Sequence, residues 1–288
     1  MTIPNNDATT TPLDNSCWVA NNDRNTATNN ATNNSTNISN SATGTASIKA
    51  LVQTSYDTIA VRYLEWATSI PSPRLELLQK LLHRLQAPSV AGSIANAKPR
   101  ILELGCGAGV PTTQLLVRSG YDVTANDISA TQIQLAREHV TVRPSSGKCE
   151  PGESGSVEFV LGDMMELDFP AGTFDAVLGL YSIFHLPLDE QEMLMRRVFR
   201  WLKQGGHLLI NVGVMADSGT IREKFLGKEM YWSCFPESVY RDIVTREGFA
   251  FVEVRLGLMW KMGRMCRSCG YWGGNRRGQF IYRSRVDI

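Results

Sequence analysis

The 288-residue chain lacks the features of several protein classes. No apolar run reaches the roughly 18 residues that a membrane-spanning helix needs. The first residues, MTIPNNDATT, have neither the basic start nor the apolar middle of a signal peptide. The formal net charge of +1 provides no strong attraction to nucleic acid or to an acidic membrane. Six scattered cysteines are typical of reduced thiols rather than of a disulfide scaffold. We therefore expect a cytoplasmic protein whose partners include neither a membrane nor a nucleic acid.

Apolar residues are also scarce in the N-terminal segment. Residues 1–45 consist largely of Asn, Thr, Ser and Ala and show no periodic apolar face. Such a segment cannot bury enough surface to offset the entropy lost on ordering, so we predict that it is disordered. Residues 46–98 are predicted to be helical, because Leu75, Leu78 and Leu82 recur on one face.

Strand and helix patterns alternate within residues 99–258. Strand-like runs occupy residues 100–104, 121–126, 157–161, 174–180, 206–212 and 249–255. Helical patterns occupy residues 111–119, 129–140, 188–202 and 236–247. This alternation predicts an α/β fold with a doubly wound, Rossmann-like parallel sheet covered by helices on both faces. In such sheets, ligands bind beyond the carboxyl ends of the strands.

Three glycines at alternate positions follow the first predicted strand, in RILELGCGAGVPTTQLL. Gly105, Gly107 and Gly109 leave the backbone bare where a ligand can approach it closely. A dinucleotide fingerprint, G-x-G-x-x-G, fails here because its last position is Val110. Glu103 precedes the first glycine by two residues, and a carboxylate at that place can hold an ammonium group. The turn therefore suits a ligand with an amino-acid end.

Two further carboxylates end the next two strands. Asp127, in YDVTANDIS, could accept hydrogen bonds from both hydroxyls of a ribose, and Ile128 offers an apolar wall to a purine. Asp163, in VEFVLGDMMELDF, could accept from an exocyclic amine, and Met164 could pack against the ring. Each acid also has a structural alternative, since Asp127 could cap a helix and Asp163 could close a turn.

These motifs resemble, in order and spacing, those of the class I S-adenosylmethionine-dependent methyltransferases, within which the chain is closest to small-molecule enzymes with a helical N-terminal segment. LELGCGAG resembles their nucleoside-methionine loop, ANDIS their ribose-binding strand end and GDMMELDF their adenine-binding one. YDTIAVRYLEW resembles their opening helix, and FDAVLGLYSIFHLPLDEQ with WLKQGGHLLINVG resembles their fourth and fifth strands. The resemblance implies S-adenosylmethionine as cofactor and no metal. It places around the cofactor Tyr56, Glu103, Gly105, Gly107, Gly109, Asp127, Ile128, Asp163 and Met164.

The resemblance also implies a reaction, which is transfer of a methyl group to nitrogen or oxygen of a small metabolite. We expect a role in secondary-metabolite biosynthesis. His185 follows the fourth strand and is the candidate general base or substrate-orienting donor, although it could equally make a structural hydrogen bond. Tyr181 is a second catalytic candidate. Tyr231 and Trp232 are candidate substrate-binding residues of a lid, and burial alone would also explain them.

Two other functions stay open. One is a protein or RNA methyltransferase, which a basic face or an added recognition domain would favour, and the sequence has neither. The other is a catalytically impaired, methyltransferase-like binding protein, which loss of the cofactor carboxylates would favour, but all three are present. Cys266 and Cys269 form only half of a zinc site, so no metal is expected. The sequence does not indicate an oligomeric state.

The C-terminal residues 259–288 depart from the family pattern. The resemblance implies a final hairpin with an acidic turn and an apolar closing strand, whereas WKMGRMCRSCGYWGG, residues 260–274, shows no apolar alternation. Codons that permit this segment can also encode, in another frame, an acidic turn followed by an apolar strand. We therefore hypothesise that a shifted reading frame begins near residues 257–260. The chain as written is expected to lack its last strand and to be poorly ordered after about residue 262.

Overall fold

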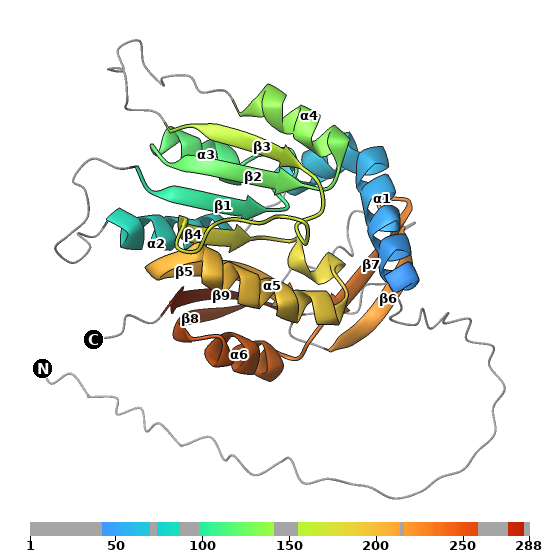
Figure 1. The fold of residues 1–288 in the computed structure, drawn as a ribbon. Coiled ribbons are helices and arrows are strands. Elements are labelled where there is room, and N and C mark those ends of the chain that lie inside the picture. The colour runs from blue at the N-terminus through green and yellow to red at the C-terminus, as the bar shows by residue number, and fades with distance from the viewer. Residues whose placement is uncertain are drawn as a thin grey trace, which may run out of the picture. The chain divides into compact units, whose positions relative to one another are not determined.

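The computed structural model describes six ranges of the chain, drawn in colour in Figure 1: residues 42–69, 74–86, 98–140, 155–213, 216–258 and 276–284. Residues 42–45, which were predicted to be disordered, begin a helix, so that boundary was wrong. Residues 1–41 lie outside the described ranges, and so do Cys266 and Cys269. The predicted helical segment 46–98 contains two helices, α1 (Ala42–Ser69) and α2 (Arg74–Gln86).

Seven strands form one sheet in the order β3-β2-β1-β4-β5-β9-β8. Their bounds are β1 Arg100–Leu104, β2 Asp122–Asp127, β3 Val157–Leu161, β4 Phe174–Gly179, β5 Leu202–Gly213, β8 Phe249–Leu258 and β9 Arg276–Ser284. Strands β1 to β5 pair in parallel, and β9 is antiparallel to both of its neighbours. The predicted Rossmann-like sheet is confirmed. The strand order reverses between β1 and β4, which is where such sheets bind ligands.

Strand β9 corrects the expectation that the chain as written lacks its last strand. Ile281 pairs with Leu209 of β5 on one side and with Glu253 of β8 on the other. The expectation was wrong because it sought the strand within residues 260–274, whereas the pairing segment is RRGQFIYRS, further along the chain. The residues on either side of β9 lie outside the described ranges. The frameshift hypothesis thus loses its structural reason, and the transcript sequence is its remaining test.

Helices cover both faces of the sheet because apolar residues alternate along the strands. Leu102 and Leu104 belong to the core beneath α5 and α6, whereas Ile101 belongs to the core beneath α2, α3 and α4. Figure 1 shows these two layers. The bounds are α3 Thr112–Arg118, α4 Ala130–His139, α5 Leu188–Trp201 and α6 Glu237–Arg246.

A third apolar cluster joins α1 to a hairpin that the sequence patterns did not predict. The hairpin consists of β6 (Asp217–Phe225) and β7 (Lys228–Cys234), which pair in a separate two-stranded sheet. Val52 and Ile59 of α1 pack in one cluster with Phe225 and Trp232 of the hairpin. In Figure 1, α1 crosses the end of the main sheet from α4 to β7. This arrangement places α1 over the carboxyl ends of the parallel strands.

Candidate functional site

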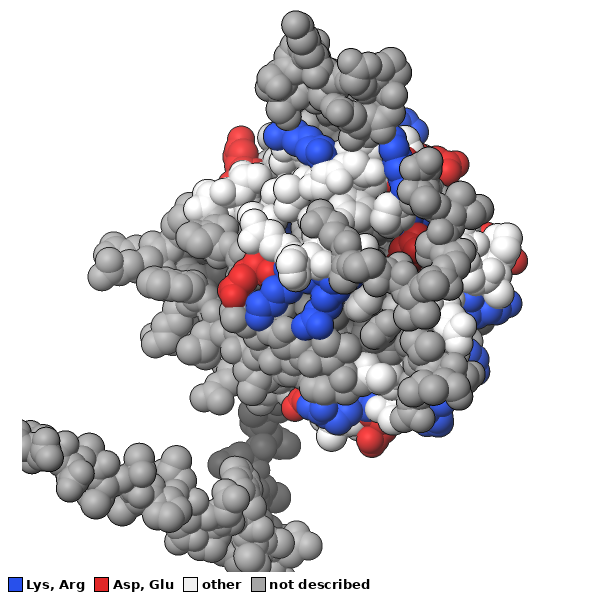
Figure 2. Space-filling view, turned by 90° about the vertical axis from the view of Figure 1, so that its left-hand side faces the viewer, with Lys and Arg blue, Asp and Glu red and all other residues white. Residues whose placement is uncertain are grey.

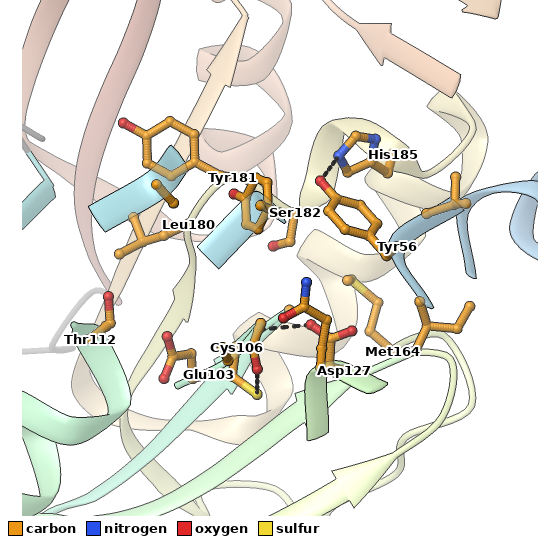
Figure 3. Close-up of a pocket in the computed structure, with 18 of the residues that line it drawn as sticks. Tyr56, Glu103, Cys106, Thr112, Asp127, Met164, Leu180, Tyr181, Ser182 and His185 are labelled. Carbon is orange, nitrogen blue, oxygen red and sulfur yellow. Dashed lines mark hydrogen bonds between the residues drawn. The ribbon is translucent and has the colours of Figure 1, made fainter. Parts of the chain in front are cut away.

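A pocket lies at the carboxyl ends of β1 to β4, and α1 contributes to its wall (Figure 3). It holds about 990 Å³ of empty space, its open mouth included. Most of the residues predicted from the sequence line it. They are Tyr56, Glu103, Gly105, Gly107, Asp127, Ile128, Asp163, Met164, Tyr181 and His185. In Figure 3, Glu103 and Asp127 lie on one side of the cavity, and Leu180, Tyr181 and Ser182 lie on the opposite side.

The glycine-rich turn is shaped by the close approach of the loop after β4. Gly105 has a φ of +73°, and a Cβ there would lie 2.3 Å from the Cβ of Ser182. The Ser182 hydroxyl donates to the carbonyl of Leu104 at 2.6 Å, which fixes this loop against the end of β1. Only glycine fits both the backbone angle and the space, so the two sides of the pocket are held at a set separation.

Gly109 is not among the residues that line the pocket, although the sequence predicted it as a cofactor residue. Its φ is +70°, and an added Cβ would lie 2.5 Å from Cγ2 of Val140 and 3.3 Å from the Cβ of Ala136. The glycine at this position lets the turn pack against the end of α4. Packing against α4 thus explains the glycine at position 109. Of the three predicted glycines, Gly105 and Gly107 line the cavity.

Glu103 is a buried carboxylate at the base of the pocket, with 3% of its surface exposed. The Thr113 hydroxyl donates to its Oε2 at 2.6 Å. Burial raises the pKa of Glu103 to about 7, although the Thr113 hydrogen bond and the charge of Arg74 act in the opposite direction. The ionised form is therefore under-stabilised, and an ammonium group placed beside it would restore the balance.

Asp127 ends β2 and accepts two backbone hydrogen bonds. Its Oδ2 accepts from the Gly107 N–H at 2.8 Å, and its Oδ1 accepts from the Ser129 N–H at 2.9 Å. Burial raises the pKa of Asp127 to about 6, and the two backbone hydrogen bonds oppose that rise. The N-cap of α4 is Ser129, which accepts from the Gln132 N–H, so the capping alternative belongs to Ser129. Carboxylate oxygens accept more than one hydrogen bond, so Asp127 retains capacity for ligand hydroxyls.

Gln132 of α4 is a pocket residue that the sequence analysis missed. It is 1% exposed, and neither its Oε1 nor its Nε2 has a hydrogen-bond partner among the described residues. The amide lies near the turn, since a Cβ added at Gly107 would be 3.7 Å from its Oε1. A buried amide without partners costs free energy, and a polar ligand in the pocket would supply them.

Asp163 and Met164 follow β3, at the side of the pocket next to the Asp127 strand end. The Asn126 amide donates to the carbonyls of Val160 and Gly162 at 3.1 and 2.8 Å, which ties this loop to β2. Oδ1 of Asp163 accepts from the Met165 N–H at 2.9 Å, which is the turn-closing contact foreseen as its structural alternative.

His185 ends the short 3₁₀ helix η1 (Ile183–His185) and contacts α1. Its Nδ1 lies 2.7 Å from the Tyr231 carbonyl, and its Nε2 lies 2.9 Å from the Tyr56 hydroxyl (Figure 3). Because a carbonyl can only accept, Nδ1 carries the proton in this contact, and neutral Nε2 accepts from Tyr56. The structure therefore pairs an imidazole and a phenol at the pocket wall, from elements 129 residues apart.

Tyr181 lies in the same loop in a backbone conformation that non-glycine residues rarely adopt. Its φ is +61°, and its N–H donates to Oδ1 of buried Asn211 on β5. The Arg74 guanidinium lies 5.4 Å from the centre of its ring. The ring thus lies at the pocket beside a cation, in a conformation that β5 stabilises.

Tyr231 and Trp232 do not line the pocket, which differs from their predicted place in a lid. Both lie on β7 and are buried at 4% and 6% exposure. The Trp232 ring centre is 4.9 Å from that of Phe184 and 4.5 Å from that of His185. Tyr231 contributes its backbone carbonyl to His185. The Trp232 ring and the Tyr231 carbonyl therefore hold the His185 ring in place, and neither residue lines the pocket.

Several residues of α1 and α2 that line the pocket were not predicted as site residues. They include Lys49, Val52, Tyr63 and Leu64 of α1 and Arg74 of α2. An amphipathic pattern shows which face of a helix is buried, and it does not show that the face covers a ligand site. No local signal distinguishes Lys49, Val52 and Arg74 from core residues, whereas Tyr63 and Leu64 lie within the segment YDTIAVRYLEW.

Among the described side chains on the face that Figure 2 shows, basic and acidic residues lie among neutral ones. Within the described ranges, no helix has the length and apolarity to cross a membrane. The same ranges contain no group of three or more His, Cys, Asp or Glu placed to hold a metal ion.

Comparison with known families assigns part of the chain. Residues 102–210 match a family model described as "Methyltransferase domain". The chain is 30% identical over 115 residues to the methyltransferase GfsG of Streptomyces halstedii, a match that covers 40% of this chain and 38% of that protein. It is 30% identical over 135 residues to the 27-O-demethylrifamycin SV methyltransferase of Amycolatopsis mediterranei, covering 44% of this chain and 46% of that protein. The chain thus spans less than half the length of these curated relatives.

Solved structures show a likeness over more of the chain. The 1,6-didemethyltoxoflavin-N1-methyltransferase of Burkholderia thailandensis, solved with 1,6-didemethyltoxoflavin and S-adenosylhomocysteine, resembles this chain with a TM-score of 0.55. The match covers 84% of this chain and 91% of that chain at 17% identity. At this identity the likeness concerns the fold.

Proposed function

We propose that the chain, whose residues 102–210 match a methyltransferase domain model, transfers the methyl group of S-adenosylmethionine to a nitrogen or oxygen atom of a small metabolite. The observation that carries the proposal is the composition of one pocket. Carboxylates from three successive strand ends meet there with a paired phenol and imidazole.

The residues of the pocket fit the proposed cofactor. Glu103 is buried, and burial disfavours its ionised form. The ammonium of the methionine end would stabilise that ionised form. Asp127 at the end of β2 suits the ribose hydroxyls, and Ile128 with Met164 offers apolar surface to the purine. The amide of Gln132 has no partner among the described residues and suits a polar atom of the nucleoside. When bound, S-adenosylmethionine supplies a methyl group on a sulfonium that is already activated for in-line displacement.

The protein's part in the reaction is to orient the acceptor and to accept its proton. Alignment of reacting groups can lower a barrier by about 7–11 kcal/mol, so positioning by the pocket walls is the larger part of catalysis. Where the acceptor must lose a proton, that proton can pass to the phenol oxygen of Tyr56 while Tyr56 passes its own to Nε2 of His185. The imidazolium that results keeps its Nδ1–H bond to the Tyr231 carbonyl. Tyr181 is the second candidate for contact with the acceptor, from the facing loop.

The choice between nitrogen and oxygen as acceptor stays part of the proposal. One relative is named for an O-demethyl substrate and one solved structure for N1-methylation, so the names of similar proteins support both. Both names denote small molecules, which supports our proposal of an enzyme of secondary-metabolite biosynthesis. Its cytoplasmic location stays a prediction.

Isotopically labelled S-adenosylmethionine, incubated with the protein and a metabolite extract, tests the function by mass spectrometry. We expect label in a low-molecular-weight product. His185→Ala should retain S-adenosylhomocysteine binding and lose the labelled product, whereas Lys224→Met, on the exposed side of β6, should retain both. Label confined to protein or RNA would favour the other methyltransferase class. Absence of S-adenosylhomocysteine binding in calorimetry would refute the proposal.

A further inference from the structure

Lys49 of α1 joins two carboxylates from other elements at the purine end of the pocket. Its Nζ lies 2.5 Å from Oδ2 of Asp163 and 2.6 Å from Oε1 of Glu190, in the first turn of α5. All three side chains are largely buried, at 18%, 14% and 11% exposure. Lys49 and Asp163 line the pocket.

The charges of this cluster do not cancel, because one ammonium faces two carboxylates. Burial acts to lower the pKa of Lys49, but the hydrogen bonds and charges of Asp163 and Glu190 outweigh it and raise the pKa. Burial raises the pKa of Glu190, and the Lys49 hydrogen bond opposes that rise. Oε2 of Glu190 has no hydrogen-bond partner among the described residues. Without Lys49, two carboxylates would face each other with no counter-charge in this cluster.

The contacts of Asp163 fix the direction in which its carboxylate points. Its Oδ1 accepts from the Met165 N–H at 2.9 Å, and its Oδ2 accepts from Lys49. Each oxygen can accept a further hydrogen bond. Loss of Lys49 would leave only the Met165 contact, and repulsion from Glu190 would turn the carboxylate away.

The same helix also holds other parts of the site. Oδ1 of Asp57 accepts from the Ser129 hydroxyl at 2.6 Å and from the Thr131 N–H at 3.1 Å, at the start of α4. Lys49, Val52 and Tyr56 recur at helical spacing, so they lie on the face of α1 that lines the pocket.

We propose that Lys49 is a positioning residue that orients the Asp163 carboxylate toward the exocyclic amine of the cofactor's purine. Through this contact, docking of α1 and recognition of adenine depend on each other. The inference rests on the proposed function, because it concerns how the same pocket recognises the purine of its cofactor.

Two ligands that differ only at the purine test the inference. S-Adenosylhomocysteine carries an exocyclic amine, and S-inosylhomocysteine carries an oxo group in its place. Calorimetry with wild-type protein should show that the adenosyl ligand binds about 10- to 100-fold more tightly, as expected for one hydrogen bond to a charged group. Lys49→Met should reduce this preference below about threefold and leave the affinity for the inosyl ligand nearly unchanged.

Three further variants separate positioning from folding. Lys49→Arg should retain most of the preference, because it keeps a cation that can reach Asp163. Glu190→Gln should also retain the preference for the adenosyl ligand, because Lys49 can still form its ion pair with Asp163. Lys224→Met, an exposed lysine on β6, controls for the loss of one positive charge.

The outcomes distinguish this inference from the function on which it rests. A Lys49→Met protein that keeps the wild-type preference, or that loses affinity for both ligands equally, would overturn the positioning role while the methyltransferase proposal stands. Failure of the wild-type protein to bind either ligand would overturn both.

Discussion

Replacing Glu103 by glutamine should stabilise the ligand-free protein above neutral pH. The pKa of Glu103 is about 7 in the fold, against an ordinary value of 4.5. A carboxyl group with a raised pKa stabilises the folded state fully below its unfolded value, and this contribution is lost as the pH rises toward 7. At about 1.4 kcal/mol for each tenfold change in proton affinity, the loss amounts to about 3 kcal/mol. Glutamine keeps the shape of the neutral acid and does not titrate.

The measurement is the free energy of unfolding in urea, followed by tryptophan fluorescence at pH 5 and at pH 8. The difference between Glu103→Gln and wild type should grow by about 2.5 kcal/mol between the two pH values, because groups that titrate alike in both proteins cancel in the comparison. Glu223→Gln, on the exposed side of β6, controls for the change in net charge. A difference that is the same at both pH values would refute the argument that burial destabilises the ionised carboxylate.

Glu103→Gln should also weaken the binding of S-adenosylhomocysteine. If ionised Glu103 holds the ammonium of S-adenosylhomocysteine, as we propose, wild-type affinity should increase as the pH rises from 5.5 to about 7. Glu103→Gln should bind more weakly and lose that pH dependence. If affinity for the ligand is independent of pH in the wild-type protein, the ammonium is held elsewhere.

Three further outcomes follow from the site. His185→Ala should lower turnover by about 100- to 10,000-fold with S-adenosylhomocysteine affinity intact, and Tyr56→Phe should also lower turnover; near-normal turnover in His185→Ala would make the imidazole structural. Asp127→Ala should weaken cofactor binding by about 1.5–3 kcal/mol in calorimetry, and unchanged affinity would remove Asp127 from the site. Gly109→Ala should lower the free energy of unfolding in urea by about 1–3 kcal/mol, because the residue has a positive φ and an added Cβ would clash with Val140. Ligand affinity should be unchanged. A variant that is fully stable but binds the ligand more weakly would show that Gly109 belongs to the cofactor site.

The parallel core and the meeting of the strand-end residues in one pocket were predictable because each depends on local sequence. Buried parallel strands appear as continuous apolar runs, and strand order places Glu103, Asp127 and Asp163 at one edge. The match of residues 102–210 to the methyltransferase domain family confirms the resemblance. Roles of single residues within the pocket stay predictions.

The elements that were missed depend on contacts between distant segments. Strand β6 is largely exposed and has register irregularities, so its alternation is broken, and its turn at Leu226 and Gly227 has no Asn-Gly signal. Strand β9, RRGQFIYRS, has arginines near both ends, so its sequence does not show the continuous apolar run typical of a strand that pairs on both sides. Lys49 is functional only through its partners on other elements, and a single helix pattern cannot indicate partners.

The position of α1 has a consequence for how this protein can diverge. The segment shared with the methyltransferase family begins at residue 102, whereas α1, α2 and the β6–β7 hairpin all lie outside it. The strand-end carboxylates lie inside that segment, and Tyr56 and Tyr63, which line the pocket from the covering helix, lie outside. Lys49 of the same helix contacts Asp163 inside that segment, so a change in α1 would alter both the covering wall of the pocket and a strand-end carboxylate.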